Sequence, residues 1–547
     1  MSRLRSAVQN GNKVVLESDE NTKRSQKKKT AIAPAVKEEP ASLSLAQNSP
    51  YHFFQALDDI SSFRRQLLAW YDRSKRELPW RTAAVTESDV NIRTYAVWVS
   101  EIMLQQTQVA TVIDYYNKWI KRWPTLEDLA SATLEEVNEM WAGLGYYSRG
   151  KRLHEGAQKV VREMDGQMPK TAEGLLKLLP GVGRYTAGAV ASIALGQATG
   201  AVDGNVIRVF SRVRAIGADS TSPAVTEALW TLANTLVDPD RPGDFNQALM
   251  EMGARVCTPK GPVCSQCPVQ MHCRAYRKVA VRQEEGTKRL LGKSALKPSS
   301  APDIEECVPA GGCALCLPSS HPWDGSLGVM NFPRKPVKKP PRLQRTLTCV
   351  LHRGGPRTQR EYFLVQRPSK GLLAGMWEFP SMLLEEDSSE MEQRGALQAQ
   401  VEKVLATPLS EKTVLHYIGE VVHVFSHIHQ TYVVYGCTVP GRADSSLAGE
   451  DEGALAARWL TNSAFQEAAV STAMKKVFKL YEKTESTESR SAKDGKRKRS
   501  PDGKSDKPHK SQKVKSGKEQ SSGTKQLSLS KFFRPPIKRE VEDGLHS

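Results

Sequence analysis

Leu178-Leu179-Pro180-Gly181-Val182-Gly183-Arg184-Tyr185-Thr186-Ala187-Gly188 is the stretch that decides how the first half of this chain folds. Two glycines stand between an apolar helix end and a new helix start, which predicts a hairpin between two helices at 178–188. Gly181 and Gly183 allow positive φ and a close backbone approach. The amides of such a turn can hold a phosphate without reading sequence. Taken alone, however, a Gly-x-Gly turn is also an ordinary connection between helices.

Helical periodicity surrounds this hairpin on both sides. It begins near Phe63, passes through Val97 to Ile120 and continues to about Ala275, in segments joined by short Gly and Pro turns. The uncharged stretch from Tyr185 to Val202 is interrupted by polar residues and glycine, which favours a buried helix and its exit over a membrane span. We therefore predict an all-α domain over residues 51–281.

Four further regions differ from it in composition. Residues 1–50 are polar and basic without period and predict a disordered arm, and residues 282–342 predict a connector rich in Ser, Pro, Gly and Lys. Residues 343–483 alternate apolar with polar positions and predict a second, α+β domain, whereas residues 484–547 predict a solvated basic tail. The strand-like runs lie at 347–351, 362–365 and 431–435, and the helical stretches at 394–405 and 464–481.

Charge and cysteine content limit the class of protein. The 547 residues carry a formal net charge of +18, which favours a polyanionic partner, although a basic tail on a neutral enzyme would give the same total. The nine cysteines are clustered, which favours metal ligation in a reducing compartment over a disulfide framework. No signal-peptide core opens the chain, and we expect no membrane partner and no nucleotide cofactor.

Two acids stand out as a candidate catalytic pair. Asp203 enters a loop in Val202-Asp203-Gly204-Asn205, directly after the Ala-rich helix that follows the hairpin. Glu101 stands among Trp, Val, Ile, Met and Leu, where burial would favour its protonated form. Two carboxylates in different environments can serve as a proton donor and as a fixed negative charge, so they suit a reaction that needs both. A lone Glu there could also be a paired structural acid.

The order of hairpin, helix and Val-Asp resembles the helix-hairpin-helix DNA glycosylase superfamily over residues 63–275. The segments Leu104-Gln105-Gln106-Thr107-Gln108-Val109 and Gly143-Leu144-Gly145-Tyr146-Tyr147-Ser148-Arg149 are similar to motifs of the MutY family of adenine DNA glycosylases. The resemblance implies a base excision repair enzyme that flips out adenine paired with 8-oxoguanine or guanine in double-stranded DNA and hydrolyses its glycosidic bond, preventing G:C to T:A transversions.

The same resemblance implies roles for individual residues. Glu101 would protonate the adenine, and Asp203 would stabilise the sugar cation or briefly bind the sugar, with Tyr185 and Asn205 assisting. Gln106 and Tyr146 would wedge into the base stack, because amide and aromatic side chains can fill the gap. The base pocket and DNA contacts would further include Trp80, Arg81, Leu104, Thr107, Gly181 and Gly183.

Two other functions remain as alternatives. The endonuclease III branch of the superfamily carries a nucleophilic lysine where this chain has Tyr185, so we expect base removal without efficient strand cutting rather than a bifunctional glycosylase and lyase. A non-catalytic iron-sulfur DNA-binding scaffold is the second alternative. The presence of both Glu101 and Asp203 argues against it.

The cysteines form two candidate metal sites. Cys257, Cys264, Cys267 and Cys273 follow Cys-x6-Cys-x2-Cys-x5-Cys spacing, which suits a 4Fe-4S cluster and, by chemistry alone, also zinc; the resemblance implies the 4Fe-4S cluster. Cys307, Cys313 and Cys316 supply three quarters of a zinc site in the connector, or they are free cysteines. His52 and His321 are the candidates for the fourth ligand. We favour His52, because a ligand from the helical domain would anchor the connector.

The second domain resembles the Nudix fold at Leu364-Val365-Gln366-Arg367 and Gly375-Met376-Trp377-Glu378-Phe379-Pro380, but it lacks the Arg-Glu-x-x-Glu-Glu metal-binding helix. This predicts a reader without hydrolase chemistry. Phe425-Ser426-His427 resembles the loop with which MutY enzymes recognise 8-oxoguanine: the ring can stack, and the hydroxyl can donate or accept at the base edge. An ordinary strand with exposed histidines is the alternative.

Two short motifs occupy the tail. Lys496-Arg497-Lys498-Arg499 is typical of a nuclear localisation patch or of a solvated basic run, so we expect a nuclear protein, with the mitochondrion as a second compartment. A pattern of Gln526, Leu529, Phe532 and Phe533 resembles the motif that docks on the sliding clamp PCNA. We expect a monomer that binds DNA and PCNA, with other replication and mismatch-repair proteins as further partners.

Overall fold

The computed structural model describes residues 50–290, 307, 313–318, 320–321, 323–336, 340–354, 360–368, 370–384, 389–410, 413–425, 427–440 and 456–495. The predicted N-terminal arm, the nuclear localisation patch and the PCNA motif lie outside these residues. No described helix is both long and apolar enough to span a membrane.

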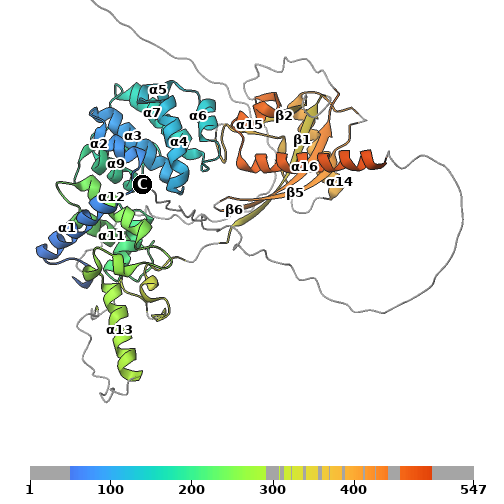
Figure 1. The fold of residues 1–547 in the computed structure, drawn as a ribbon. Helices are drawn as coiled ribbons and strands as arrows, with labels where there is room; N and C mark the ends of the chain where they lie inside the picture. The colour runs from blue at the N-terminus through green and yellow to red at the C-terminus, as the bar shows by residue number, and fades with distance from the viewer. Residues whose placement is uncertain are drawn as a thin grey trace, which may run out of the picture. The chain divides into compact units, whose positions relative to one another are not determined.

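The first part of the chain is all-α, as predicted (Figure 1). Its α-helices are α1 (Leu57–Ser74), α2 (Pro79–Thr86), α3 (Val90–Leu104), α4 (Val109–Arg122), α5 (Leu126–Ser131), α6 (Leu134–Trp141), α7 (Ser148–Glu163), α8 (Ala172–Leu178), α9 (Arg184–Leu195), α10 (Gly204–Val213), α11 (Pro223–Leu236), α12 (Pro242–Arg255) and α13 (Arg274–Leu290). A short 3-10 helix, Pro50–His52, precedes them, and two more, Cys264–Gln266 and Gln270–His272, lie between α12 and α13.

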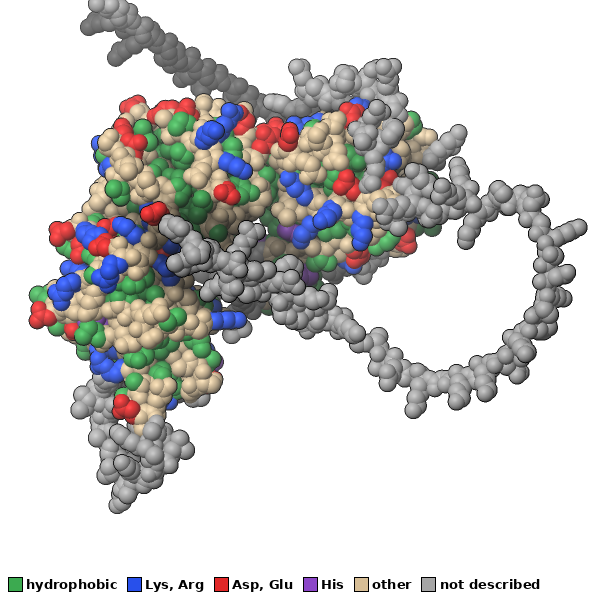
Figure 2. Space-filling model, in the orientation of Figure 1, with side chains coloured by type: hydrophobic (Ala, Val, Ile, Leu, Met, Phe, Trp, Pro, Cys, Tyr) green, Lys and Arg blue, Asp and Glu red, His purple; other side chains and the backbone are tan. Residues whose placement is uncertain are grey.

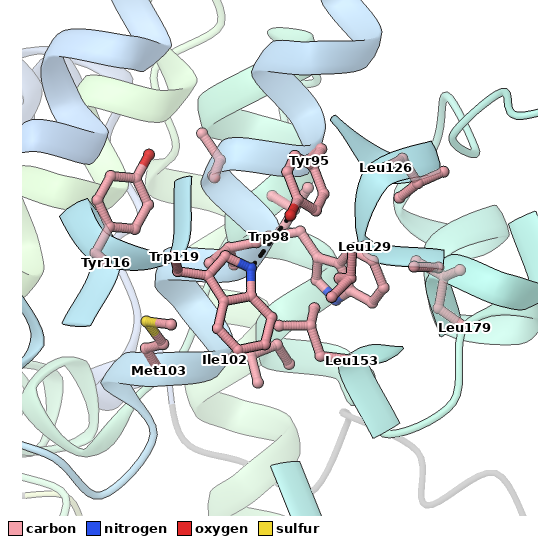
Figure 3. Packing of buried hydrophobic residues seen from close by; sticks show 14 of the residues in the cluster. Tyr95, Trp98, Ile102, Met103, Tyr116, Trp119, Leu126, Leu129, Leu153 and Leu179 are labelled. Carbon is pink, nitrogen blue, oxygen red and sulfur yellow. Dashed lines mark hydrogen bonds between the residues drawn. The ribbon is translucent and has the colours of Figure 1, made fainter. Parts of the chain in front are cut away.

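Helix α3 is central to this part because ten of its consecutive residues, Thr94 to Met103, are buried. A helix that is apolar all round must be surrounded by protein, and α3 contacts α2, α4, α7 and α9. Figure 3 shows Trp98, Ile102 and Met103 of α3 packed with Trp119, and a hydrogen bond of 3.2 Å from the Trp119 indole to the Tyr95 hydroxyl. This packing fixes the end of α3 that carries Glu101.

A second hydrophobic core lies between α1, α10, α11 and α12. Phe63 and Leu67 of α1 are completely buried there against Phe210 and Phe245. The hairpin between α8 and α9 packs in the first core, through Leu179 and Val182. Helix α9 is almost entirely buried, which confirms the buried helix expected after Tyr185.

Two helix boundaries differ from the sequence prediction. The helical period from Val97 to Ile120 is broken, because α3 ends at Leu104 and α4 begins at Val109. Between them Gln106 has a φ of 59°, which is incompatible with a continuous right-handed helix. Helix α13 runs past position 282, where the connector was expected to start, to Leu290.

The second part of the chain is α+β, as predicted. Its strands are β1 (Arg342–Arg353), β2 (Glu361–Gln366), β3 (Trp377–Glu378), β4 (Ser381–Leu383), β5 (His416–Val424), β6 (Ile428–Thr438) and β7 (Ala457–Thr461). They form one sheet in the order β3-β2-β1-β6-β5, in which β4 also pairs with β1 and β7 with β2. Strands β1 and β6 run parallel, from the pair Arg342 and Ile428 to the pair His352 and Thr438.

Each face of the sheet carries its own core. Leu347, Cys349 and Leu351 of β1 pack with α14 (Glu390–Leu405) on one face, and Val350 packs with α16 (Thr472–Gly495) on the other. This alternation confirms the strand predicted at 347–351. The helical stretch predicted at 464–481 is two helices, α15 (Asn462–Glu467) and α16. Helix α16 continues beyond position 484, where the tail was expected to begin.

The excess of positive charge lies outside the two predicted domains. Residues 51–281 contain 27 Lys and Arg against 24 Asp and Glu, and residues 343–483 contain 15 against 16. On the face drawn in Figure 2, basic and acidic side chains are accordingly interspersed. The counts therefore favour basic flanking segments on nearly neutral domains.

Candidate active site and metal centres

Glu101 lies in the last turn of α3, 4% exposed, and accepts a hydrogen bond of 2.6 Å at Oε2 from the Tyr185 hydroxyl. Burial raises the pKa of Glu101 to about 7, with Tyr185 opposing this shift and the charge of Asp203 adding to it. Tyr185 stands in the first turn of α9, and burial holds the pKa of its hydroxyl well above the usual value. The hairpin thus brings Tyr185 to an acid that lies 84 positions earlier in the chain.

Asp203 is the N-cap of α10. Its Oδ1 accepts hydrogen bonds from the amides of Asn205 (2.9 Å) and Val206 (2.7 Å), and its Oδ2 accepts one from the Asn205 side chain (2.7 Å). Burial raises the pKa of Asp203, whereas these three donors oppose the shift because they favour the carboxylate. The site therefore holds two buried acids in contrasting surroundings.

Asn205 connects this acid to the cysteine-rich loop. Its Oδ1 accepts from Arg208 Nη2 at 2.7 Å, and Arg208 Nε donates to the Cys257 carbonyl, also at 2.7 Å. Arg208 Nη2 further donates to the carbonyl of Gly253 at 2.6 Å. A Cβ at Gly253 would lie 2.6 Å from the Asn205 Cβ, so only glycine fits beside Asn205.

Trp80 and Arg81, predicted to line the base pocket, begin α2. Trp80 is buried edge-on against the Tyr116 ring, with the centroids 5.5 Å apart. Arg81 donates to Glu251 Oε2 at 2.9 Å, and Arg76 binds the same fully buried carboxylate through Nε at 2.6 Å. The sequence analysis named neither Arg76 nor Glu251, since nothing in the local pattern of α12 distinguishes Glu251 from a surface acid.

The hairpin glycines differ from each other. Gly181 has a φ of +77°, as expected, but Gly183 has a φ of −97° and is the extended N-cap of α9. Only Gly181 therefore uses the positive φ that glycine allows. No atom lies within 4 Å of a Cβ built on Gly183, so its surroundings are open in front of the amides that start α9. That opening fits the approach of a phosphate.

The residues expected beside the flipped base lie on two loops. Gln106 and Thr107 follow Leu104 at the end of α3, and Tyr146 precedes α7. Gln106 is exposed, and the Tyr146 side chain is 47% exposed, so both are accessible to a ligand. Leu104 and Thr107 are half-buried.

The first cysteine set lines one cavity. Cys257, Cys264, Cys267 and Cys273 line one small apolar cavity together with Val329 of the connector. Burial raises the pKa of Cys267 and Cys273 to about 12, so both are neutral thiols at neutral pH unless a bound metal stabilises the thiolates.

Side chains around that cavity also suit a metal group. Buried Arg212 points Nη1 at Cys257 Sγ, 3.4 Å away, and its Nε donates to the Phe332 carbonyl of the connector at 3.0 Å. A positive donor next to a thiolate sulfur favours the ligand form. The donor set thus fits a sulfur-ligated cluster.

The second set converges on a single point. One ligand atom each from His52, Cys307, Cys313 and Cys316 lies within 4.8 Å of the others, and this is the one such group among the described residues. Four ligand atoms that close suit one tetrahedral ion. His52 Nδ1 is 2.9 Å from the Arg214 carbonyl, and burial lowers the His52 pKa to about 4, so Nε2 is available as a ligand. His321 lies outside this group and is 3.2 Å from Arg334.

The predicted reading loop is the turn between β5 and β6. Phe425 donates its amide to the Ile428 carbonyl at 2.8 Å, and its ring lies edge-on to His423, with the centroids 4.7 Å apart. His427 is exposed. Ser426 lies outside the described residues. A turn, and not a continuous strand, therefore carries these side chains.

Two family models match the chain. Residues 99–235 match the HhH-GPD superfamily of base excision DNA repair proteins, and residues 356–480 match the NUDIX domain. The first contains Glu101, Tyr185 and Asp203, and the second contains the β5–β6 turn. The two predicted domains therefore correspond to two known families.

Relatives with high identity cover most of the chain. Human adenine DNA glycosylase is 58% identical over 80% of this chain and 77% of its own length, and the rat enzyme is 55% identical over 84% and 85%. Among solved structures, the C-terminal domain of mouse MUTYH in complex with human PCNA is 42% identical over 26% of this chain and 88% of that chain, with a TM-score of 0.22. With its helix-hairpin-helix and Nudix domains, the chain belongs to the adenine DNA glycosylase family and is a DNA glycosylase of base excision repair.

Proposed function

We propose that this glycosylase removes adenine paired with 8-oxoguanine or guanine, by an acid-assisted, monofunctional mechanism centred on Glu101 and Asp203. The observation that carries the proposal is the pair of buried acids held in different states. Glu101 has one hydroxyl partner and a pKa near 7, whereas Asp203 has three donors. This difference in surroundings favours Glu101 as the proton donor and Asp203 as the anion.

Glu101 supplies the proton. With a pKa of about 7, a large fraction of its carboxyl groups is protonated at neutral pH, so the group can donate to a ring nitrogen of adenine as the base leaves. The Tyr185 hydroxyl donates to Oε2 and leaves Oε1 for the substrate proton. After transfer, the same hydrogen bond stabilises the Glu101 carboxylate that remains.

Asp203 supplies the negative charge. As the glycosidic bond breaks, positive charge develops on the sugar, and a fixed carboxylate stabilises it without reorganisation. Asn205 holds Oδ2 and the helix amides hold Oδ1, so the anion is oriented before the substrate arrives. We assign to Asp203 either this ion-pair role or a short-lived bond to the sugar carbon.

A lyase reaction is disfavoured by the groups around the two acids. In the described chain, Glu101 is bonded by a tyrosine and Asp203 by an asparagine and two amides. No primary amine stands among these partners to form a Schiff base. A bifunctional enzyme of the endonuclease III type is therefore the weaker candidate, and water completes the reaction as hydrolysis.

We assign a structural role to both metal sites. We assign a 4Fe-4S cluster to Cys257, Cys264, Cys267 and Cys273, which line one cavity, and zinc to His52, Cys307, Cys313 and Cys316. When bound, the cluster stiffens the loop whose Cys257 carbonyl holds Arg208 beside Asn205. The zinc would tie the connector to the helical part through His52.

Recognition of the opposite base is assigned to Phe425, Ser426 and His427. The turn presents an exposed His427 next to Phe425, and stacking with base-edge hydrogen bonding suits a modified purine. On the catalytic side, open space at Gly183 and exposed Gln106 and Tyr146 support double-stranded DNA as the ligand.

The tail motifs support two further assignments. Gln526, Leu529, Phe532 and Phe533 would bind PCNA, and the basic run at 496–499 would direct the enzyme to the nucleus. Both assignments depend on the sequence patterns alone. Mitochondrial location and other replication or mismatch-repair partners stay expectations.

The decisive experiment is a single-turnover assay of the full chain on duplexes with adenine opposite 8-oxoguanine, guanine, cytosine or thymine. We expect adenine release to be fastest opposite 8-oxoguanine, slower opposite guanine and absent opposite cytosine and thymine. Product strands should stay uncut until alkali is added. Equal rates on all four duplexes, or strand cutting without alkali, would contradict the proposal.

A further inference from the structure

Arg149 is a buried cation in the first turn of α7, 7% exposed, and its guanidinium donates to six groups at the end of α3 and on the two loops beside it. Nη1 donates to the carbonyls of Ile102 and Met103, both at 2.9 Å, and to the carbonyl of Gln105. These groups belong to the last turn of α3 and the residue after it. Their own intrahelical partners are missing because the helix ends there.

The second arm of the guanidinium reaches both loops. Nη2 donates to the Thr107 hydroxyl at 3.1 Å and to the Gly145 carbonyl at 3.0 Å. The cation also lies 5.3 Å from the centroid of the Tyr146 ring. Arg149 therefore contacts the residues on each side of Gln106 and those on each side of the Gly145–Tyr146 peptide.

No ion pair compensates this charge in the part of the chain that the structure describes. Every acceptor of Arg149 is a neutral carbonyl or hydroxyl, and burial lowers its pKa to about 10, which still leaves it charged at neutral pH. Burying a cation without a carboxylate is costly. An exposed side chain could cap the end of α3 equally well, so capping alone does not explain why Arg149 is buried.

Each of the two loops that Arg149 joins contains one residue with a left-handed backbone conformation. Gln106 has a φ of 59° and Tyr146 a φ of 49°, conformations that side chains other than glycine seldom adopt. Both side chains are exposed, and they are the two assigned above to the gap beside the flipped base. Such backbone conformations persist only where surrounding contacts determine them.

We propose that Arg149 is a positioning residue that locks the Gln106 loop and the Tyr146 loop in one register, so that both side chains enter the DNA stack together. This inference rests on the wedge roles assigned to Gln106 and Tyr146. Arg149 touches neither the adenine nor the sugar. It acts by fixing the spacing of the two wedges before DNA binds.

The geometry requires an arginine. The planar guanidinium offers donors in a fixed fork, which lets one arm serve the end of α3 while the other spans Thr107 and Gly145. A lysine ammonium would keep the charge but would lose the fork. Arg149→Lys should therefore loosen the coupling of the two loops while it keeps the buried positive charge.

The test uses duplexes with 2-aminopurine next to the target adenine, whose fluorescence rises when the stack opens. Each variant is made in the full chain, with and without Glu101→Gln to stop the chemistry. Arg149→Lys should reduce the fluorescence rise per bound complex and slow single-turnover release at saturating enzyme by roughly ten- to a hundredfold. Arg162→Lys is the matched control, because Arg162 lies in the same helix, exposed, and should change neither value.

A second variant keeps the test independent of folding. Thr107→Val removes one acceptor of Arg149 without touching the buried charge, and it should lower the fluorescence rise to a smaller extent. Thr107→Val alone decides the question if Arg149→Lys fails to fold by circular dichroism. A structural role would lower the melting temperature but leave the fluorescence per complex unchanged.

The possible outcomes separate two failures. A fluorescence rise equal to that of the wild type in Arg149→Lys, or in Thr107→Val where the first variant does not fold, overturns the inference. If Gln106→Ala with Tyr146→Ala also leaves the rise unchanged, the wedge assignment itself is wrong. If the fluorescence rise is reduced in the wedge double variant but normal in Arg149→Lys, the wedge assignment stands and only the positioning role of Arg149 is rejected.

Discussion

Replacing Glu101 by Gln should abolish catalysis and at the same time stabilise the protein at alkaline pH. Glu101 is buried in the last turn of α3, and burial raises its pKa to about 7 from the usual value of 4.5 for a glutamate side chain. Ionising it in the folded state therefore costs more free energy than ionising it in the unfolded chain. Glutamine has nearly the same shape and can still accept the Tyr185 hydroxyl through its amide oxygen.

The sign and size follow from linkage. Between pH 4.5 and 7 the folded protein binds more protons at Glu101 than the unfolded chain, so the free energy of unfolding falls as pH rises through this window. The total loss is about 3 kcal/mol once pH exceeds 7, from a pKa difference of about 2.5. Glu101→Gln does not titrate, so it should be more stable than the wild type by about this amount at pH 8 and about equally stable at pH 4.5.

Urea denaturation followed by tryptophan fluorescence would measure the difference at pH 4.5, 6, 7 and 8. Glu136→Gln is the control, since Glu136 is on the surface and its pKa is lowered, not raised, by Thr133. In the same samples, single-turnover adenine release should be lost in Glu101→Gln while binding of the mismatched duplex is kept. A stability difference that does not grow with pH would refute the raised pKa and with it the acid role.

Four further predictions follow. Asp203→Asn should slow adenine release on the order of a thousandfold with little change in duplex binding; near-normal single-turnover rates would remove it from the mechanism. Cys313→Ser should lower bound zinc but not iron by elemental analysis, and unchanged zinc would contradict the connector site. Phe425→Ala should reduce the preference for 8-oxoguanine over guanine by about 1–3 kcal/mol in paired single-turnover assays, whereas equal losses on both duplexes would make it a general contact. Phe532→Ala with Phe533→Ala should lose PCNA in a pull-down yet keep activity on short duplexes; equal PCNA retention would exclude the motif.

The sequence was informative where local chemistry is unusual. Glu101 could be named because an acid inside an apolar helical segment is rare, and Asp203 because it ends a buried helix in a loop with an Asn two positions later. The two domain folds were correctly predicted from the period of their apolar residues. A histidine of the helical domain could be proposed as the fourth ligand from zinc chemistry, and His52 does lie with the three connector cysteines.

Long-range partners could not be predicted. The contacts of Glu251 with Arg76 and Arg81 join residues 175 and 170 positions apart in the chain, and no local pattern marks such a pair. The break between α3 and α4 was missed because the four polar residues Gln105 to Gln108 contain neither the glycine nor the proline that usually marks a turn. The guanidinium of Arg149 takes the carbonyl groups that the end of α3 leaves without helical partners, and this long-range contact has no local signal in the sequence.

The positions of the two acids in their helices explain why their roles are not interchangeable. Asp203 caps the N-terminus of α10, where amides and the positive end of the helix dipole favour an anion. Glu101 lies in the last turn of α3, where the dipole presents its negative end and the apolar core adds the cost of desolvation. Burial raises the pKa of both acids, but only Asp203 sits at a donor end, where amides favour its carboxylate and oppose the shift. Arg149 binds the same acceptor end of α3, so part of that negative potential is already neutralised, and burial must supply most of the shift at Glu101.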